Sequence, residues 1–400
     1  MKWHLHNGDC VAFMSTLPAE SIDSVVCDPP YGLGFMGKDF DKLGPGPAQQ
    51  AWHADWLAEA LRVLKPGGHL VAFGGQRTIH RLTCAAEDVG FDVRDQGAWA
   101  FWSGFPKSLD VSKAIDKAAG AEREVVGPGR WNHIKGDNAK QRDCLIRPGG
   151  KHDITAPATE NARRWQGWGT ALKPALEPWV LCRKPLIGTV ADNVLRYGTG
   201  ALNIDACRYR YGDLAWPGPS DKSHDGAVFV RGANAGPPRM AFGSFASDYD
   251  ATKVMSAHDL GRWPANIYYC PKVSRAEREA GCEHLTPRTE AEAVDREEGS
   301  AGMANPGAGA GRTADSVRNH HPTLKPIELM AWLCRLVTPS GGVVLDPFAG
   351  SGSCGAAALA GGFRYLGAEL DPDYATIAEA RIAHHAGLFG MRQPGADGVL

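Results

Sequence analysis

The sequence lacks several features that would place the chain in a membrane or in an oxidising compartment. No apolar run approaches the roughly 20 residues that a membrane-spanning helix needs, and Met1 to His4 do not open the apolar core of a signal peptide. The 10 Cys residues are scattered, without the close pairs of a disulfide framework. We therefore expect a soluble, cytoplasmic protein with reduced thiols and no membrane partner.

Metal-binding patterns are also scarce. Cys270, Cys282 and His284 follow the spacing Cys-x11-Cys-x-His, which lacks a close Cys pair and an evident fourth ligand. Structural zinc sites need four ligands. We expect no bound metal.

Net charge is low, at −2 over 400 residues, which by itself argues against a nucleic-acid partner. Its distribution is uneven, however. From Phe101 to Arg278 there are 26 Lys and Arg against 18 Asp and Glu, whereas the rest of the chain has 17 against 27. A basic middle between acidic ends is typical of a nucleic-acid-contacting insertion on an acidic body. Chance variation along a solvated surface is the alternative.

Both ends of the chain alternate strand and helix patterns. Short apolar runs at 22–27, 69–73, 343–345 and 364–370 predict buried strands. An alternating order of strands and helices predicts an α/β fold with a doubly wound, mostly parallel sheet. Apolar residues at helical spacing predict helices at 52–64, 77–88, 327–337, 353–360 and 374–385.

The middle of the chain has a different composition. Residues 127–170 and 217–243 are rich in Gly, Pro, Asn and Trp and show little periodicity. Residues 290–319 are low in complexity, which predicts a flexible loop or linker. These stretches separate the two α/β ends in sequence.

A Gly-rich motif follows the predicted strand at 343–345. It begins at Asp346 and continues through Phe348, Gly350 and Gly352 into a predicted helix. Glycines let the backbone turn tightly and approach a ligand beside a helix N-terminus. Glu369, at the end of the next strand, could accept both ribose hydroxyls of an adenosine. The spacing also fits a dinucleotide fingerprint, so NAD binding and a purely structural turn stay open here.

A second motif, Asp28-Pro29-Pro30-Tyr31, ends the predicted strand at 22–27. An exocyclic base amine is a poor nucleophile because its lone pair is delocalised into the ring. The Asp28 carboxylate and the Pro29 carbonyl could each accept one of its N–H groups, which would free the lone pair and stabilise charge developing on nitrogen. Pro30 stiffens the loop, and Tyr31 offers a face on which a flipped base can stack. An ordinary strand-ending turn is the alternative.

The two motifs in this order resemble the β-class amino-methyltransferases of DNA. Three further stretches are similar to segments of that family: 7–10, which holds Asp9, 64–70, and 321–326, which holds Thr323 and Lys325. Residues 101–107 and 172–184 resemble two halves of another family segment, split by an insertion. The likeness covers roughly half of the chain, mostly its two ends.

The resemblance implies S-adenosylmethionine as cofactor and double-stranded DNA as substrate, with direct methyl transfer to a flipped base. An Asp at the position of Asp28 accompanies adenine targets more often than cytosine targets, so we expect N6 of adenine. The pocket for the base would be formed by Asp28, Pro29, Pro30 and Tyr31. The resemblance assigns the following contacts to the cofactor: Asp9, Thr323, Lys325, Asp346, Phe348, Gly350, Gly352 and Glu369.

The same resemblance divides the chain. Residues 1–126 would form the catalytic half and 320–390 the cofactor-binding half of one methyltransferase domain. Residues 127–284 would be an insertion with the target recognition region, of which 165–185 return to the catalytic domain, and 285–319 a flexible linker. We expect the insertion, including Arg163 and Arg164, to supply most phosphate contacts.

Several alternatives remain open at this point. They are an N4-cytosine enzyme, a methyltransferase of RNA or of protein glutamine, a catalytically silent DNA-binding module and an NAD enzyme. No Pro-Cys dipeptide occurs, which argues against a cysteine nucleophile acting on C5 of cytosine. No nuclease motif is evident, so we expect modification without cleavage. A homodimer and a restriction endonuclease partner both stay open.

Overall fold

The computed structural model describes residues 2–34, 39–101, 103–104, 108–127, 154–209, 261–289 and 316–390. Much of the predicted insertion and most of the predicted linker, at 128–153, 210–260 and 290–315, lie outside the described residues. The chain divides into two compact units. The larger comprises Met1–Trp102 and Leu176–Leu400, and the smaller Ser103–Ala175.

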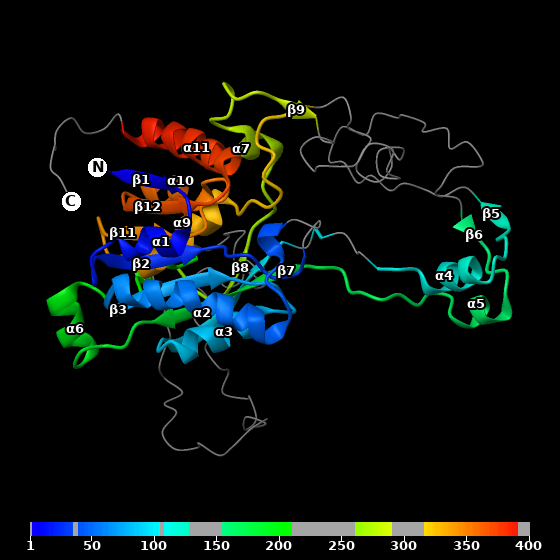
Figure 1. The fold of residues 1–400 in the computed structure, drawn as a ribbon, viewed down its shortest axis with the longest axis horizontal. Coiled ribbons are helices and arrows are strands. Elements are labelled where there is room, and N and C mark those ends of the chain that lie inside the picture. The colour runs from blue at the N-terminus through cyan, green and yellow to red at the C-terminus, as the bar shows by residue number, and fades with distance from the viewer. Residues whose placement is uncertain are drawn as a thin grey trace, which may run out of the picture. The chain divides into compact units, whose positions relative to one another are not determined.

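Among the described residues, eight strands of the larger unit form one sheet (Figure 1). Neighbouring strands in this sheet run parallel, except that β7 runs antiparallel to both β3 and β4. This confirms the predicted mostly parallel sheet. The strands in spatial order are β1 (Trp3–Asn7), β12 (Arg364–Glu369), β11 (Val343–Asp346), β2 (Ile22–Cys27), β3 (Leu64–Phe73), β7 (Leu176–Arg183), β4 (Asp92–Ala100) and β8 (Ile267–Tyr269).

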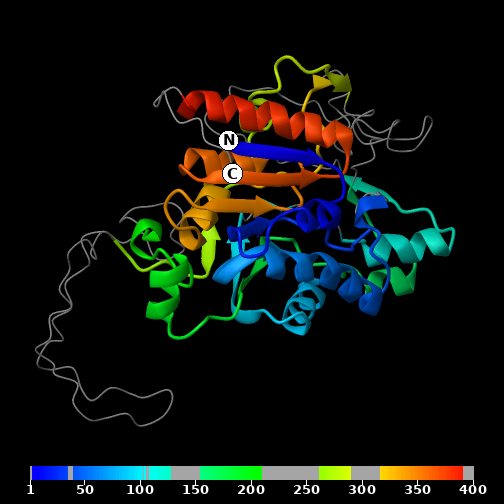
Figure 2. The same ribbon diagram turned by 60° about the vertical axis from the view of Figure 1, so that its left-hand side comes forward.

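Helices cover both faces of the sheet (Figure 2). Successive side chains of a strand point to opposite faces, and β2 shows the consequence. Val26 packs in one buried cluster with residues of α9, α10 and α11, whereas Val25 and Cys27 pack in another with residues of α1, α2 and α3. Two apolar layers enclose the sheet, which makes the fold doubly wound. The helices are α1 (Cys10–Ser15), α2 (Gly46–Val63), α3 (Ile79–Asp88), α9 (Ile327–Val337), α10 (Ser353–Ala360) and α11 (Pro372–Gly390).

Several element boundaries differ from the prediction. Strand β3 begins at Leu64, whereas the predicted strand begins at residue 69. Leu64 already pairs with Ile22 of β2, before an irregularity in the register of the two strands. Helix α2 begins six residues earlier than predicted, where Pro47 occupies its first turn without needing a backbone donor. Strands β4 and β7 were not predicted as elements: β4 mixes polar and apolar residues, and the apolar run of β7 is short and follows Glu177 and Pro178.

The smaller unit contains α4 (Val111–Ala118), β5 (Val125–Gly127), β6 (Ile154–Thr155) and α5 (Glu160–Arg164). Asp116 links the elements of this unit. Its carboxylate accepts hydrogen bonds from the backbone N–H groups of Ala158 and Thr159 and forms an ion pair with Arg123. Burial would raise the pKa of Asp116, but these hydrogen bonds outweigh it and lower the pKa to about 2. The carboxylate therefore joins α4 to the start of α5.

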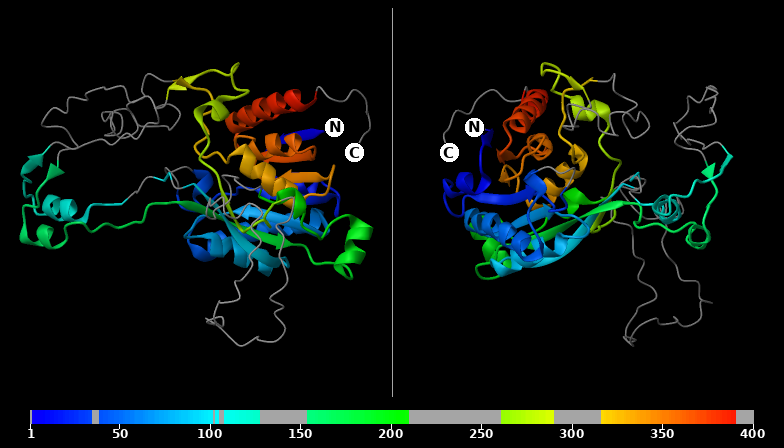
Figure 3. Two further views of the ribbon diagram at one scale, coloured as in Figure 1. Left: turned by 180° about the vertical axis from the view of Figure 1, so that it is seen from behind. Right: turned by 45° about the vertical axis from the view of Figure 1, so that its right-hand side comes forward.

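The remaining elements lie in the larger unit. The α7 segment runs beside α11 (Figure 3), where Cys282 packs against Tyr374 and Ile377. No helix within the described ranges is long and apolar enough to cross a membrane. No group of three or more metal-ligating side chains was found among the same residues. The elements are η2 (Asp39–Asp41), α6 (Val190–Tyr197), η3 (Asp205–Cys207), α7 (Arg275–Glu279), β9 (Arg288–Thr289) and β10 (Ser316–Val317).

Candidate active site

Four predicted site residues lie at one edge of the sheet. Because β1, β12, β11 and β2 are parallel, their carboxyl ends meet there. Asp9 follows β1, Glu369 ends β12, Asp346 ends β11 and Asp28 follows β2. The helices after β11 and β2 leave on opposite faces of the sheet. Such a switch point opens a crevice at the strand ends, which is where ligands bind in doubly wound sheets.

The Gly-rich turn after β11 requires its glycines for two different reasons. Gly350 and Gly352 have φ angles of +54° and +76°, which favour glycine. A Cβ at Gly352 would lie 2.8 Å from the Ala378 carbonyl oxygen in α11, whereas a Cβ at Gly350 would lie 3.0 Å from the His321 side chain. Gly352 therefore permits close packing on a helix, and Gly350 keeps the turn itself free of a side chain.

Of the two acidic groups beside this turn, Asp346 is buried and Glu369 is half-buried. Glu369 accepts hydrogen bonds from the Gly350 and Asp371 N–H groups, at 2.7 and 2.9 Å. Asp346 accepts from the Phe348 N–H group and the Tyr365 hydroxyl, at 3.1 and 3.3 Å. Desolvation raises the pKa of Asp346 to about 8 and that of Glu369 to about 7. Each carboxylate keeps further lone pairs for a ligand.

Three other predicted cofactor residues have local partners. The Asp9 side chain caps α1 through the Ala12 N–H group at 2.8 Å. The Phe348 ring packs against Trp52 and Trp56 of α2, with centroids 5.8 and 5.2 Å apart. Thr323 is exposed in the segment before α9, and its carbonyl oxygen lies 2.5 Å from His321 Nδ1. Their contacts with a cofactor stay predictions.

The loop after β2 is held from two sides. The carbonyl oxygen of Tyr31 accepts from the Gln49 side chain of α2 at 2.9 Å and from the Thr78 hydroxyl at 2.7 Å. The Asp41 carboxylate accepts from the Gly32 and Leu33 N–H groups. These anchors, which the sequence did not single out, fix the backbone on which Asp28 and Tyr31 sit.

Lys325 lies against the Asp28–Tyr31 loop rather than the Gly-rich turn. Its ammonium donates to Asp28 Oδ2 at 2.5 Å, to the Tyr31 hydroxyl at 3.1 Å and to Glu177 Oε2 at 3.2 Å. Its side chain is only 4% exposed. Burial alone would lower the pKa of Lys325, but Asp28 and then Glu177 outweigh it and raise the pKa. The predicted contact of Lys325 with a cofactor stays a prediction, and its described partners are the two carboxylates and the tyrosine.

Glu177 is the main member of the site that the sequence did not indicate. It lies near the start of β7, and because β7 is antiparallel, that start lies at the carboxyl edge of the parallel strands. The Tyr31 hydroxyl is 3.2 Å from Glu177 Oε2 and 2.8 Å from Asp28 Oδ1. The only available signal was its place in the stretch 172–184.

Comparison with known proteins identifies the family of the chain. Residues 22–116 and 228–380 match the N6/N4 methyltransferase family model, described as DNA methylase. The chain belongs to this DNA methylase family. The match includes the Asp28–Tyr31 loop and the Gly-rich turn after β11, and it confirms the resemblance found in the sequence.

Individual relatives of this methylase are more distant. The type II methyltransferase M.HindIII of Haemophilus influenzae is 26% identical over 238 residues, 50% of this chain and 64% of that protein. YubD of Escherichia coli (strain K12) is 46% identical over 86 residues, 22% of this chain and 37% of YubD. The chain thus spans less than two thirds of either relative.

Solved structures also match over nearly the whole chain. The PvuII DNA methyltransferase (cytosine-N4-specific) superposes with a TM-score of 0.47 and 14% identity, covering 98% of this chain and 92% of that one. The complex of M1.HpyAVI with SAM superposes with a TM-score of 0.40 and 14% identity, covering 95% and 98%.

A buried arginine supports the Gly-rich turn of the methylase. The Arg381 side chain of α11 donates to the Ser351 carbonyl oxygen at 2.5 Å and to the Ser351 and Ser353 hydroxyls at 3.1 and 3.2 Å. Arg381 is fully buried. These hydrogen bonds connect the turn to α11. No sequence pattern indicated this role of Arg381.

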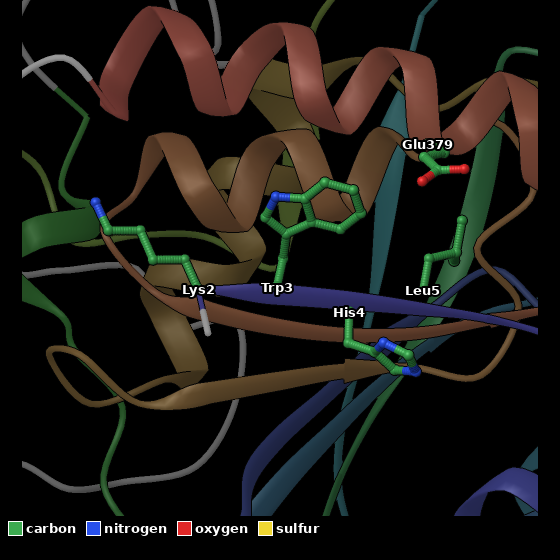
Figure 4. Close-up of a pocket in the computed structure, with 5 residues that line it drawn as sticks. All are labelled: Lys2, Trp3, His4, Leu5 and Glu379. Atoms are coloured by element: carbon green, nitrogen blue, oxygen red, sulfur yellow. The ribbon is translucent and has the colours of Figure 1, made fainter. Parts of the chain in front are cut away.

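A hollow of about 400 Å³ lies elsewhere, at the outer strand β1 (Figure 4). Trp3 and Leu5 point toward the helices on one face and His4 points to the other, as strand alternation requires. In the sheet β1 is separated from β2 by β12 and β11. No predicted site residue lines this hollow, whose walls are Lys2, Trp3, His4, Leu5 and Glu379.

Proposed function

We propose that this methylase transfers a methyl group from S-adenosylmethionine to the exocyclic amino nitrogen of a flipped base in DNA, and that the base is adenine. One observation carries the proposal. The Asp28–Tyr31 loop and the Gly350–Gly352 turn follow two adjacent parallel strands, β2 and β11, so an amine at the first and a methyl donor at the second would meet in one crevice. Membership of the DNA methylase family supports the same reaction class.

The residues at the strand ends fit the cofactor. Asp346 and Glu369 are partly or fully buried acids suited to a cationic amino acid moiety and to ribose hydroxyls. The positive φ of Gly350 leaves the turn without a side chain where a ligand would approach. When bound, S-adenosylmethionine supplies an electrophilic methyl group. The assignment of Asp9, Thr323 and Phe348 to the same ligand rests on the family resemblance.

The chain's own groups would act on the amine. Asp28 and the Pro29 carbonyl would accept its two N–H groups and so orient the nitrogen lone pair. That lone pair forms the new N–C bond, while the electrons of the broken C–S bond stay on sulfur. Asp28 then takes the extra proton from the methylated nitrogen. Much of the rate would come from positioning.

The choice of adenine rests on Asp28 and the family resemblance, since either exocyclic amine presents two N–H donors. The test is methylation of duplex DNA with isotopically labelled S-adenosylmethionine, followed by digestion to nucleosides and mass spectrometry. We expect label in N6-methyladenine. Label in N4-methylcytosine alone would overturn the choice of base, and label in RNA or protein but not DNA would overturn the substrate.

A matched pair of variants separates chemistry from binding. Asp28→Asn keeps the size of the side chain but removes its charge and basicity. Methyl transfer should fall by at least about 100-fold, in the range of lost general-base catalysis, while calorimetric cofactor affinity stays within about twofold. The surface variant Glu87→Gln on α3, whose side chain is exposed, should leave both unchanged. Full transfer by Asp28→Asn would contradict its role.

A further inference from the structure

We propose that Tyr31 and Glu177 form a proton exit, through which the proton that Asp28 takes from the methylated amine passes to Glu177 and then to water. The inference rests on the proposed function and adds two roles to it. A single hydroxyl lies between two carboxylates, 2.8 Å from Asp28 Oδ1 and 3.2 Å from Glu177 Oε2. It carries one proton and can donate it to only one of them at a time.

Lys325 sets the direction of this hydroxyl. An ammonium has three N–H donors, and those of Lys325 are directed to Asp28, Glu177 and the Tyr31 oxygen. Because the tyrosine oxygen accepts from Lys325, its own proton must point toward a carboxylate. In the present state the shorter contact is to Asp28, so the hydroxyl must turn toward Glu177 before it can receive a proton from Asp28.

The charges of the cluster allow it to take up one proton. Asp28 and Glu177 share a single cation, so together with Lys325 they carry one negative charge in excess. The phenol is not an alternative store of that charge, because burial and the two carboxylates hold the pKa of Tyr31 well above its usual value. A proton added to the cluster brings it to neutrality, and it resides on a carboxyl group.

Position decides which carboxyl group releases the proton. Asp28 faces the proposed base at the end of β2, and a bound base would cover it. Glu177 lies on β7, two strands away in the sheet, and its side chain is 25% exposed against 22% for Asp28, so the two acids are open to water to a similar extent without a base. With a base bound over Asp28, Glu177 would be the carboxyl group of the pair that water still reaches.

The step balances without any further reactant. The N–H bond of the methylated amine breaks, its electron pair stays on nitrogen, and the proton binds Asp28. The Tyr31 hydroxyl then turns from Asp28 to Glu177, gives its proton to Glu177 Oε2 and receives the one held by Asp28. Net, one proton moves from the amine to Glu177, and Tyr31 and Asp28 return to their starting forms. Only the hydroxyl at the edge of the tyrosine ring takes part in the transfer.

The test compares methyl transfer with proton release in one turnover. Enzyme with bound S-adenosylmethionine is mixed with duplex DNA, methyl transfer is followed by rapid quench, and proton release by a pH indicator dye. In the wild-type chain we expect the two to keep pace. In Tyr31→Phe, which keeps the ring, and in Glu177→Gln, proton release should lag behind methyl transfer in the same variant by about tenfold or more, a fraction of the effect of a positioned proton acceptor. The double variant should lag no more than either single variant.

Further results decide the outcome. Calorimetric affinity for S-adenosylmethionine should stay within about twofold in each variant, and Glu177→Asp should restore part of the prompt proton release. Prompt proton release in both Tyr31→Phe and Glu177→Gln overturns the proton exit but not the proposed function. Loss of the methyl burst in Glu177→Gln with cofactor binding intact also overturns the exit, because Glu177 would then act on Asp28 itself. Absence of any methyl transfer to DNA by the wild-type chain overturns the proposed function as well.

Discussion

The two glycines of the turn after β11 should separate folding from cofactor binding when each is replaced by Ala. In Gly352→Ala the new Cβ would lie 2.8 Å from the Ala378 carbonyl oxygen and 2.9 Å from the Ala378 Cα, both backbone atoms of α11. The left-handed φ of +76° costs about 1–2 kcal/mol, and the overpacking about 1–3 kcal/mol. The free energy of unfolding should fall by about 2–5 kcal/mol.

In Gly350→Ala the same backbone cost applies, since φ is +54°. The nearest atom, however, is His321 Nε2 at 3.0 Å, which belongs to a side chain that can shift. We expect only about 1–2 kcal/mol of destabilisation, so the protein folds. The Cβ would instead stand in the turn that the proposed cofactor approaches, and affinity should fall at least about tenfold.

Urea unfolding and calorimetric titration with S-adenosylmethionine measure the two effects. Gly352→Ala should lose the greater stability, and Gly350→Ala should lose affinity while remaining folded. Equal loss of stability in both variants would refute the packing argument. Undiminished affinity in folded Gly350→Ala would refute the assignment of the turn to the cofactor.

Three other predictions follow from the site and the smaller unit. Affinity for S-adenosylmethionine should rise with pH between about 6 and 8, by up to about tenfold per unit for each group that must ionise. The sign follows from the raised pKa values of Asp346, about 8, and Glu369, about 7: both acids hold protons at pH 6, and the cationic ligand favours their ionised forms. Calorimetry in buffers of different ionisation enthalpy should show proton release on binding, and pH-independent affinity would contradict it. Arg381→Met should reduce cofactor affinity, because the Gly-rich turn loses its buried donor to Ser351 and Ser353; titration beside a melting curve checks this, and unchanged affinity would make Arg381 purely structural. Replacing Arg163 and Arg164 of α5 by Gln should weaken binding to all DNA sequences and flatten its salt dependence; an unaltered slope in fluorescence anisotropy would exclude them as phosphate contacts.

The strands and turns that carry the chemistry could be predicted because their signals are local. The apolar run at 22–27 ends at the rigid Asp28-Pro29-Pro30 sequence, and glycines with positive φ follow β11. Strand length, strand-end turns and helix periodicity each depend on a few neighbouring residues. The mostly parallel sheet followed from their alternation.

Strands β4 and β7 were harder to predict because their stability comes from pairing. β4 mixes polar and apolar residues in an irregular order, whereas the apolar run of β7 is only Trp179–Cys182, and each strand is held by its neighbours in the sheet. A strand of this kind acquires its state from the surface on which it packs rather than from its own sequence.

The sequence by itself determined the family, the fold class and the two motifs, since each is written in adjacent residues. Which side chains meet around Asp28, namely Tyr31, Glu177 and Lys325, was decided only by tertiary structure. Lys325 and Asp28 are 297 positions apart, and Tyr31 and Glu177 are 146 apart. They meet because β7 is two places from β2 in the order β2-β3-β7, and because β7 runs antiparallel and brings its first residues to the same edge. Coulomb attraction over about 3 Å then pairs Lys325 with both carboxylates, an interaction that depends on distance in space and leaves no periodic trace in the chain.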